Sequence, residues 1–203
     1  MKFSVNQKDL QNSLNYCQGV IEKRSTLPIL SNVLLEAKDQ NLKIIATDLD
    51  LIFIQNISNI QIAEEGTTTT SCSIMYDIVR KFSNEKKIDF NLVNENKIHL
   101  LSDKSSFNLN CLKASEFPIT ESNFRDNEFK LNSKKILKLL NKCKFSISND
   151  ETRHYLSGIF LHTTENESKK FLTAVATDSH RMAISKTILD QDIIFEPIIL
   201  PKK

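Results

Sequence analysis

Glycine is scarce in this sequence, with only Gly19, Gly66 and Gly158 among 203 residues. A phosphate-binding P-loop and a dinucleotide fingerprint each need several glycines at fixed spacing, so the sequence excludes both. Long apolar runs are missing as well, since no stretch approaches the ~18–20 apolar residues of a membrane helix. The first six residues contain no apolar core and no small-residue cleavage site, so we expect no secretion signal.

Cysteine occurs only as Cys17, Cys72, Cys111 and Cys143, none of them in a CxxC pair or at metal-ligand spacing from a histidine. Isolated thiols are typical of a reducing compartment, so we expect a cytoplasmic protein without a metal or other cofactor. Charge is nearly balanced, with 27 basic and 25 acidic side chains. Net charge therefore gives no argument for nucleic acid, and any such argument depends on where the basic residues lie.

Two stretches of the chain match each other in the same order, at an offset of 126 positions. The matches include Phe3 with Phe129, Asn6 with Asn132, Cys17 with Cys143, Leu35 with Leu161 and, after a shift of four residues, Ala46-Thr47-Asp48 with Ala176-Thr177-Asp178. Internal similarity of this kind implies repeated structure. Because the period is as long as a domain, it predicts tandem domains and not a solenoid.

The first copy has the pattern of an antiparallel α+β unit. Asn6 predicts the cap of one helix, with apolar residues at positions 10, 14, 17 and 21, and Ser73 predicts the cap of a second. The expected strands are Ile29–Ala37, Leu42–Thr47, Leu51–Ile57, Ile88–Val93, Lys97–Leu101 and Ser106–Cys111. Hairpin-length connections dominate, so we expect two helices covering one face of an antiparallel sheet.

The second copy repeats only the first part of this pattern. We expect a domain at 1–112, a polar linker at 113–128 and a second domain at 129–203. Its expected elements are a helix at Ser133–Lys144 and strands at Leu156–His162, Phe171–Thr177 and Met182–Lys186. Pro201-Lys202-Lys203 falls where the second helix should begin, so the second domain is expected to be truncated.

Lysines gather on the predicted helix 133–144, which has five of them and no acidic residue. Lys134, Lys138 and Lys142 recur every four residues, opposite an apolar side that includes Ile136 and Leu139. A solvated surface gives one explanation of this stripe. A track for a phosphate backbone gives another, because lysines on a helix bind phosphates without reading base sequence.

Two clusters of polar residues follow predicted strands and invite a catalytic interpretation. Asp48 and Asp50 belong to one cluster, and Asp178, His180 and Arg181 to the other. Carboxylates and histidine can bind a metal or perform acid–base chemistry, which leaves a metal-dependent hydrolase using Asp48, Asp50, Asp178 and His180 as an alternative. For Asp48 and Asp50, aspartate after a strand is also common turn chemistry. No nucleophile with a supporting loop accompanies the second cluster, for which the rim of a binding site is the other interpretation. We therefore favour a binding scaffold without catalytic residues.

Four motifs resemble the bacterial sliding clamp, the beta subunit of DNA polymerase III. They are Thr26-Leu27-Pro28-Ile29-Leu30-Ser31-Asn32, Ala46-Thr47-Asp48-Leu49, Glu116-Phe117-Pro118 and Ala176-Thr177-Asp178-Ser179-His180-Arg181-Met182-Ala183. The resemblance runs from Met1 to Lys203. It implies a family in which each chain has three DNA-clamp domains and two chains close a ring around duplex DNA. This chain would then hold the first domain and part of the second, with the third domain absent.

The resemblance also implies a non-catalytic processivity factor. Its partners would be double-stranded DNA bound independently of sequence, replicative and translesion polymerases, the clamp loader and, in the full-length protein, a second copy in a homodimer. A DNA-independent peptide-binding module is the other alternative that the sequence leaves open.

Particular residues match functional positions of the family. The implied DNA-binding residues are Arg24, Asn149, Lys202 and Lys203. The implied wall of a pocket for partner peptides is Leu156, Thr177, Ser179, His180, Arg181 and Met182. The implied first-domain half of the dimer interface is Ile78, Phe82, Ser106, Phe107 and Leu109. The sequence departs from the family at three of these or nearby positions: Asn149 often corresponds to Gln, Ser179 to Gly in some members, and Ser73 to a DNA-binding arginine in some.

Overall fold

The computed structural model describes residues 1–22, 26–83, 86–119, 130–150, 152–167, 169–189 and 195–202. The chain divides into two compact units, Met1–Glu121 and Ser122–Lys203, and each is described by itself. Over the described ranges, no helix is both long and apolar enough to cross a membrane.

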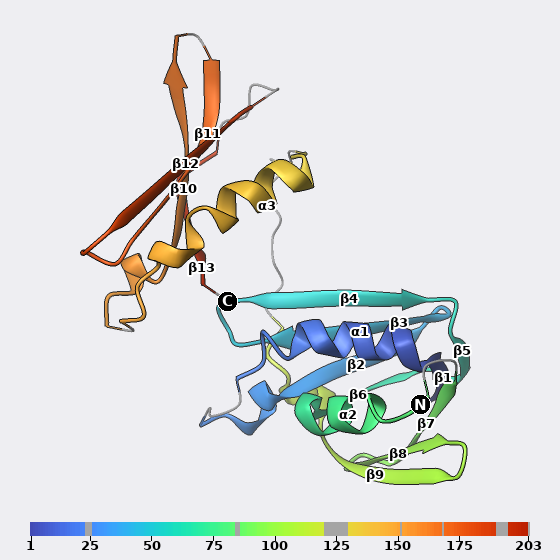
Figure 1. Cartoon of the computed structure of the whole chain (residues 1–203). Coiled ribbons are helices and arrows are strands. Elements are labelled where there is room, and N and C mark those ends of the chain that lie inside the picture. The colour runs from blue at the N-terminus through green and yellow to red at the C-terminus, as the bar shows by residue number, and fades with distance from the viewer. Residues whose placement is uncertain are drawn as a thin grey trace. The chain divides into compact units, whose positions relative to one another are not determined.

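The first unit is built on an antiparallel sheet with the strand order β4-β3-β2-β6-β9-β8-β7-β1-β5. Its strands are β1 (Lys2–Asn6), β2 (Asn32–Lys38), β3 (Asn41–Thr47), β4 (Ile52–Ser58), β5 (Gln61–Glu64), β6 (Gly66–Ser71), β7 (Lys87–Asn94), β8 (Lys97–Ser102) and β9 (Ser105–Leu112). Two helices, α1 (Gln7–Cys17) and α2 (Cys72–Val79), pack on one face of this sheet (Figure 1). The predicted α+β class, with helices against antiparallel strands, is confirmed.

The main core of this unit lies between the helices and the sheet. The Asn6 side chain accepts a hydrogen bond from the backbone N–H of Lys8 at 2.9 Å, which starts α1 as predicted. Leu10 and Leu14 then face the sheet at helical spacing and are fully buried. Beneath them the rings of Phe3 and Phe90 stack at a centroid distance of 4.7 Å.

Three local predictions for the first unit were wrong. Helix α2 begins at Cys72 and is capped by Ser71, whose hydroxyl accepts from the Ile74 N–H, so Ser73 is not the cap. Ile29 lies in a short 3₁₀ helix, Pro28–Ser31, because Pro28 presets its first turn and removes a strand donor. Strands β1, β5 and β6 were not predicted. Strand β6 is a run of threonines whose buried hydroxyls bond the backbone of β9, which an apolar-alternation criterion does not detect.

A second, smaller core covers the opposite face of β2 and β3. Leu34 and Ile45, which pair across the two strands, contact Phe117 from the chain that follows β9. Phe117 comes directly after a 3₁₀ turn at Ala114–Glu116. Part of the stretch expected to be a polar linker is therefore structured and packed on the first unit, while residues 120–128 lie outside the described ranges.

In the second unit, helix α3 (Ser133–Asn141) packs against a sheet ordered β12-β11-β10-β13 (Figure 1). Its strands are β10 (Gly158–Asn166), β11 (Lys169–Thr177), β12 (Met182–Ile188) and β13 (Ile198–Pro201). Asn132 caps α3 as Asn6 caps α1. The helix ends at Asn141, three residues earlier than predicted, and Pro201 ends a strand paired with Gly158 where a helix start was predicted.

The internal repeat is visible as repeated structure. Elements α1, β2, β3 and β4 correspond to α3, β10, β11 and β12 in order and pairing. In the first unit Leu34 pairs with Ile45 and Ile45 with Ile54. In the second, Phe160 pairs with Val175 and Val175 with Ile184, at the offsets that the sequence comparison gave.

Candidate functional site

The turn between β11 and β12 positions most of the predicted pocket wall. The Thr177 hydroxyl donates to the Arg181 carbonyl at 2.8 Å and accepts from the Ser179 N–H. One Asp178 carboxylate oxygen accepts from the N–H groups of His180 and Arg181, both at 3.0 Å. These bonds hold His180 and Arg181 at the surface, with Met182 beginning the next strand.

The first unit contains the same turn at the matching positions. Thr47 accepts from the Leu49 N–H at 3.0 Å, and Asp48 accepts from the N–H groups of Asp50 and Leu51. Leu49 and Ser179 both adopt left-handed backbone conformations, with φ of 81° and 77°. The repeated Ala-Thr-Asp sequence therefore forms the same turn in both units. In each turn the residue after the aspartate has a positive φ.

We expect Leu49→Gly to stabilise the first unit by about 0.5–1 kcal/mol. A non-glycine residue costs roughly 1–2 kcal/mol in this region of φ and ψ, and the larger unfolded-state entropy of glycine offsets part of the gain. Urea denaturation of the wild type and the variant measures the difference. Leu51→Gly, in the same turn but without a positive φ, should destabilise the protein, and an equal effect of both changes would contradict this explanation.

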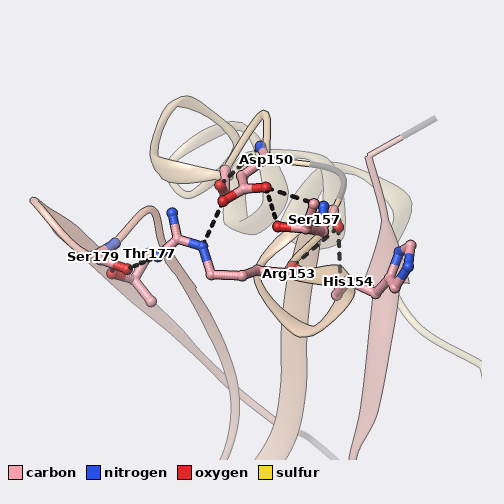
Figure 2. A network of polar contacts seen from close by, with 8 residues as sticks. Asp150, Arg153, His154, Ser157, Thr177 and Ser179 are labelled. Atoms are coloured by element: carbon pink, nitrogen blue, oxygen red, sulfur yellow. Dashed lines mark hydrogen bonds and ion pairs between the residues drawn. The ribbon is translucent and has the colours of Figure 1, made fainter.

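Arg153 connects this turn to the loop that precedes β10 (Figure 2). Its Nε donates to the Asp150 carboxylate at 2.7 Å, and its Nη1 donates to the Ser179 hydroxyl at 2.8 Å. The loop is closed further by the Leu156 N–H, which donates to the Arg153 carbonyl at 2.9 Å. The Ser179 hydroxyl thus accepts a hydrogen bond that glycine, the residue of some family members at this position, could not accept. Sequence reasoning missed Arg153, because a pair of side chains 26 positions apart leaves no local pattern.

Hydrogen bonds to the charged form lower the pKa of both carboxylates in this region. The Thr152 hydroxyl and N–H, together with Arg153, lower the pKa of Asp150 from 3.8 to about 2. The N–H groups of Arg181 and His180 lower the pKa of Asp178. Both side chains therefore stay ionised at neutral pH and act as acceptors that fix the two loops.

The second unit should lose stability as pH falls from about 4 to about 2. Because the folded pKa of Asp150 is depressed, its contribution is present above its unfolded value of 3.8 and is lost as pH falls through about 2. Asp150→Asn removes this titration, so the variant should show a shallower decline in melting temperature over that interval. Parallel curves for the two proteins would show that Asp150 contributes nothing.

Apolar side chains lie beside these polar groups. Met182 is 63% exposed at the start of β12, and Leu156 is half-buried at the end of a 3₁₀ turn, His154–Leu156. The Arg181 guanidinium lies 5.6 Å from the ring centre of Phe145. An apolar surface rimmed by donors suits a short peptide with apolar anchors.

Residues predicted to contact DNA fall into two groups. Asn149 and Lys202 are brought together, since the Lys202 ammonium donates to the Asn149 amide oxygen. Arg24 and Lys203 lie outside the described residues. Lys134, Lys135 and Lys138 of α3 are exposed whereas Leu139 is buried, so the predicted amphipathic pattern is present.

Residues of the predicted dimer interface belong to α2, β9 and the turn after α2. The rings of Phe82 and Phe107 meet edge to face at 5.9 Å. The Ser106 hydroxyl lies 2.7 Å from His99 Nε2. Ile78 is half-buried against the core, whereas Leu109 is buried within it, so Leu109 supports this surface from below.

The carboxylates that suggested a hydrolase have structural partners. Asp48 and Asp178 each accept two backbone N–H groups in equivalent turns, which is what the turn interpretation predicted for Asp48. The two aspartates occupy matching positions of the internal repeat, which explains why the motif occurs twice. The hydrolase alternative is therefore not supported.

Comparison with known proteins covers both units. Residues 1–121 match the model of the DNA polymerase III beta subunit, N-terminal domain, and residues 130–203 match that of its central domain. The beta sliding clamp of Caulobacter vibrioides is 33% identical over all of the chain and 55% of its own length, and that of Rickettsia felis is 36% identical, with 52% covered.

Solved structures give the same result. The sliding clamp from Caulobacter crescentus has a TM-score of 0.93 at 32% identity, and the chain covers 55% of it. The clamp from Bartonella birtlesii bound to griselimycin has a TM-score of 0.92 at 32% identity, with 54% covered. The chain spans about half the length of these relatives. Across that span, it belongs to the family of the DNA polymerase III beta subunit, the bacterial sliding clamps.

Proposed function

We propose that the protein acts as the processivity factor of the replicative DNA polymerase in the cytoplasm of a bacterium. It would bind duplex DNA without regard to sequence and tether polymerases and the clamp loader through the pocket wall at Thr177–Met182. The observation that carries the proposal is family membership along the whole chain, including the turn that forms this wall. In this proposal the protein is not an enzyme, and it works by holding partners together.

We also propose roles for the individual residues. Arg24, Asn149, Lys202 and Lys203 would approach the DNA backbone, with the lysine stripe of α3. Phe82, Phe107 and Ser106, supported by Ile78 and Leu109, would form part of a dimer interface that closes a ring. The exposed ring of Phe107, which meets the half-buried ring of Phe82, favours a protein contact, because aromatic side chains are enriched where protein surfaces meet.

Replacing Lys134, Lys138 and Lys142 together with glutamate should weaken binding to duplex DNA uniformly across sequences. Each lost phosphate contact lowers the slope of log affinity against log salt by about one, so the slope should fall by up to about 3. Fluorescence titrations of the natural protein that contains this chain, between about 50 and 200 mM salt, measure it. Exposed Lys38, Lys97 and Lys104 of the first unit provide a matched control triple. Equal slopes for the two triple variants would remove α3 from the proposed DNA surface.

A further inference from the structure

A hollow of about 500 Å³ lies on the sheet of the first unit, over the neighbouring strands β5, β1, β7 and β8. Successive side chains of a strand point to opposite faces, so Phe3 and Phe90 enter the core while the polar residues next to them line the hollow. The hollow therefore lies on the face turned away from α1 and α2. Its volume falls within the ~300–1,000 Å³ of pockets that hold small molecules.

Three hydrogen-bond donors stand side by side across this hollow. Lys2 of β1 pairs with Asn91 of β7, and Asn91 pairs with His99 of β8, so neighbouring side chains are about 5 Å apart on one face. We refer to Lys2, Asn91 and His99 as the donor row. An ammonium, an amide and an imidazole in one row suit an anionic group such as a phosphate.

The donor row is available to a ligand. Within the part of the chain that the structure describes, the side chains of Lys2 and Asn91 have no hydrogen-bond partner and no ion pair. His99 is half-buried, and its Nε2 lies 2.7 Å from the Ser106 hydroxyl. When Ser106 donates to Nε2, Nδ1 carries the proton and can donate to a ligand.

A carboxylate occupies a second row, two residues along the strands and so about 7 Å from the first. The Ser4 hydroxyl donates to Oδ1 of Asp89, which holds the carboxylate in place and leaves Oδ2 for a ligand. Leu101, which pairs with Asp89 across β7 and β8, is 40% exposed and adds an apolar surface beside it. A fixed carboxylate beside an apolar surface suits the edge of a flat ring that carries two adjacent N–H donors.

We propose that the hollow binds a guanine mononucleotide. Guanine presents N1–H and its N2 amino group on one edge, and the ribose places the phosphate at the other end of the molecule. The base edge would bond Asp89 with the base plane against Leu101, and the phosphate would meet the donor row, whose reach the long Lys2 side chain extends. An amino acid, whose ammonium and carboxylate share one carbon, cannot span both rows.

The inference goes beyond the proposed function and does not depend on it. Every residue of the hollow belongs to the first unit, whereas the proposed pocket wall for partner peptides belongs to the second. Loss of peptide binding would therefore leave the nucleotide site intact, and loss of nucleotide binding would leave the peptide pocket intact.

Isothermal titration calorimetry with GMP, on the natural protein that contains this chain, tests the inference. We expect a dissociation constant below about 1 mM. AMP, which lacks the paired donors, and guanosine, which lacks the phosphate, should each bind at least about tenfold more weakly, because hydrogen bonds to charged groups are lost. Lys2→Gln should weaken GMP binding by a similar factor, and Asp89→Asn should bring the affinities for GMP and AMP within about twofold of each other.

Lys97→Gln is the matched control for Lys2→Gln. Lys97 is exposed on β8, two residues before His99, and lies outside the hollow, so this change should leave GMP binding unchanged. Melting temperatures within about 2 °C of the wild type show that the variants are folded.

Three results would overturn the site. The first is no binding of GMP up to about 1 mM. The second is equal affinity of the wild type for GMP and AMP, because the carboxylate would then recognise no base edge. The third is an equal loss in Lys2→Gln and Lys97→Gln, which would indicate only a general attraction of the phosphate to a positive charge.

Discussion

Replacing Met182 with aspartate should reduce the affinity for the partner peptide of the proposed function by at least about 30-fold while changing the melting temperature by less than about 2 °C. Met182 begins β12 directly after the turn that forms the proposed pocket wall, so a carboxylate there would have to be desolvated when a ligand binds. The side chain is 63% exposed in the unbound protein, so the fold does not depend on it.

A matched control lies on the same strand. Ile188 is also exposed and points to the same side of β12 as Met182, but it lies at the far end, away from the turn. Ile188→Asp should therefore leave binding of the partner peptide unchanged, as measured by isothermal titration calorimetry. A collapse of the melting temperature in Met182→Asp would place Met182 in the core, and equal losses in both variants would indicate a non-specific charge effect.

The largest expected effect on stability comes from the core of the first unit. Phe90 is 1% exposed and stacks on Phe3 of β1, so Phe90→Ala removes a ring from a closely packed site. Such substitutions cost about 3–5 kcal/mol, a large part of the ~5–15 kcal/mol that stabilises a typical domain. We expect calorimetry to show a fall of roughly 10–20 °C in the melting temperature of the first unit.

Val93 on the same strand provides the comparison for Phe90. Its side chain is exposed, so Val93→Ala should change stability by less than about 0.5 kcal/mol. The transition of the second unit should be unaffected by either change, because Phe3 and Phe90 belong to a core made of first-unit residues alone. A small effect of Phe90→Ala would mean that the stacked pair contributes little and that β1 is held by its backbone hydrogen bonds.

Sequence patterns predicted the elements whose signals are local. Asn6 and Asn132 each combine a cap with apolar residues at helical spacing, and both helices begin where those signals indicated. The repeated Ala-Thr-Asp motif forms equivalent turns at Thr47 and Thr177, because an Asp that accepts successive N–H groups is encoded within five residues. Where local signals agree with the global fold, the sequence alone predicts the position of a helix or turn.

Signals that depend on distant partners were missed. Thr69 and Thr70 are polar by composition but buried, because their hydroxyls meet carbonyls of β9 some 40 positions away. Phe117 lies in a stretch that was expected to be a polar linker. Only the folded unit shows that its side chain packs with Leu34 and Ile45. The bond from Arg153 to Ser179 likewise joins two loops that only the sheet brings together. The pocket wall could be predicted by resemblance, whereas its supporting contacts could not.

The most direct test of the central claim is a primer-extension assay on singly primed circular DNA. It uses the natural protein that contains these 203 residues, its cognate polymerase and clamp loader, and excess competitor DNA, so that each product reports a single binding event. We predict that the protein lengthens the products greatly and that the Met182→Asp variant does not. Products of equal length with and without the wild-type protein would contradict its assignment as a processivity factor.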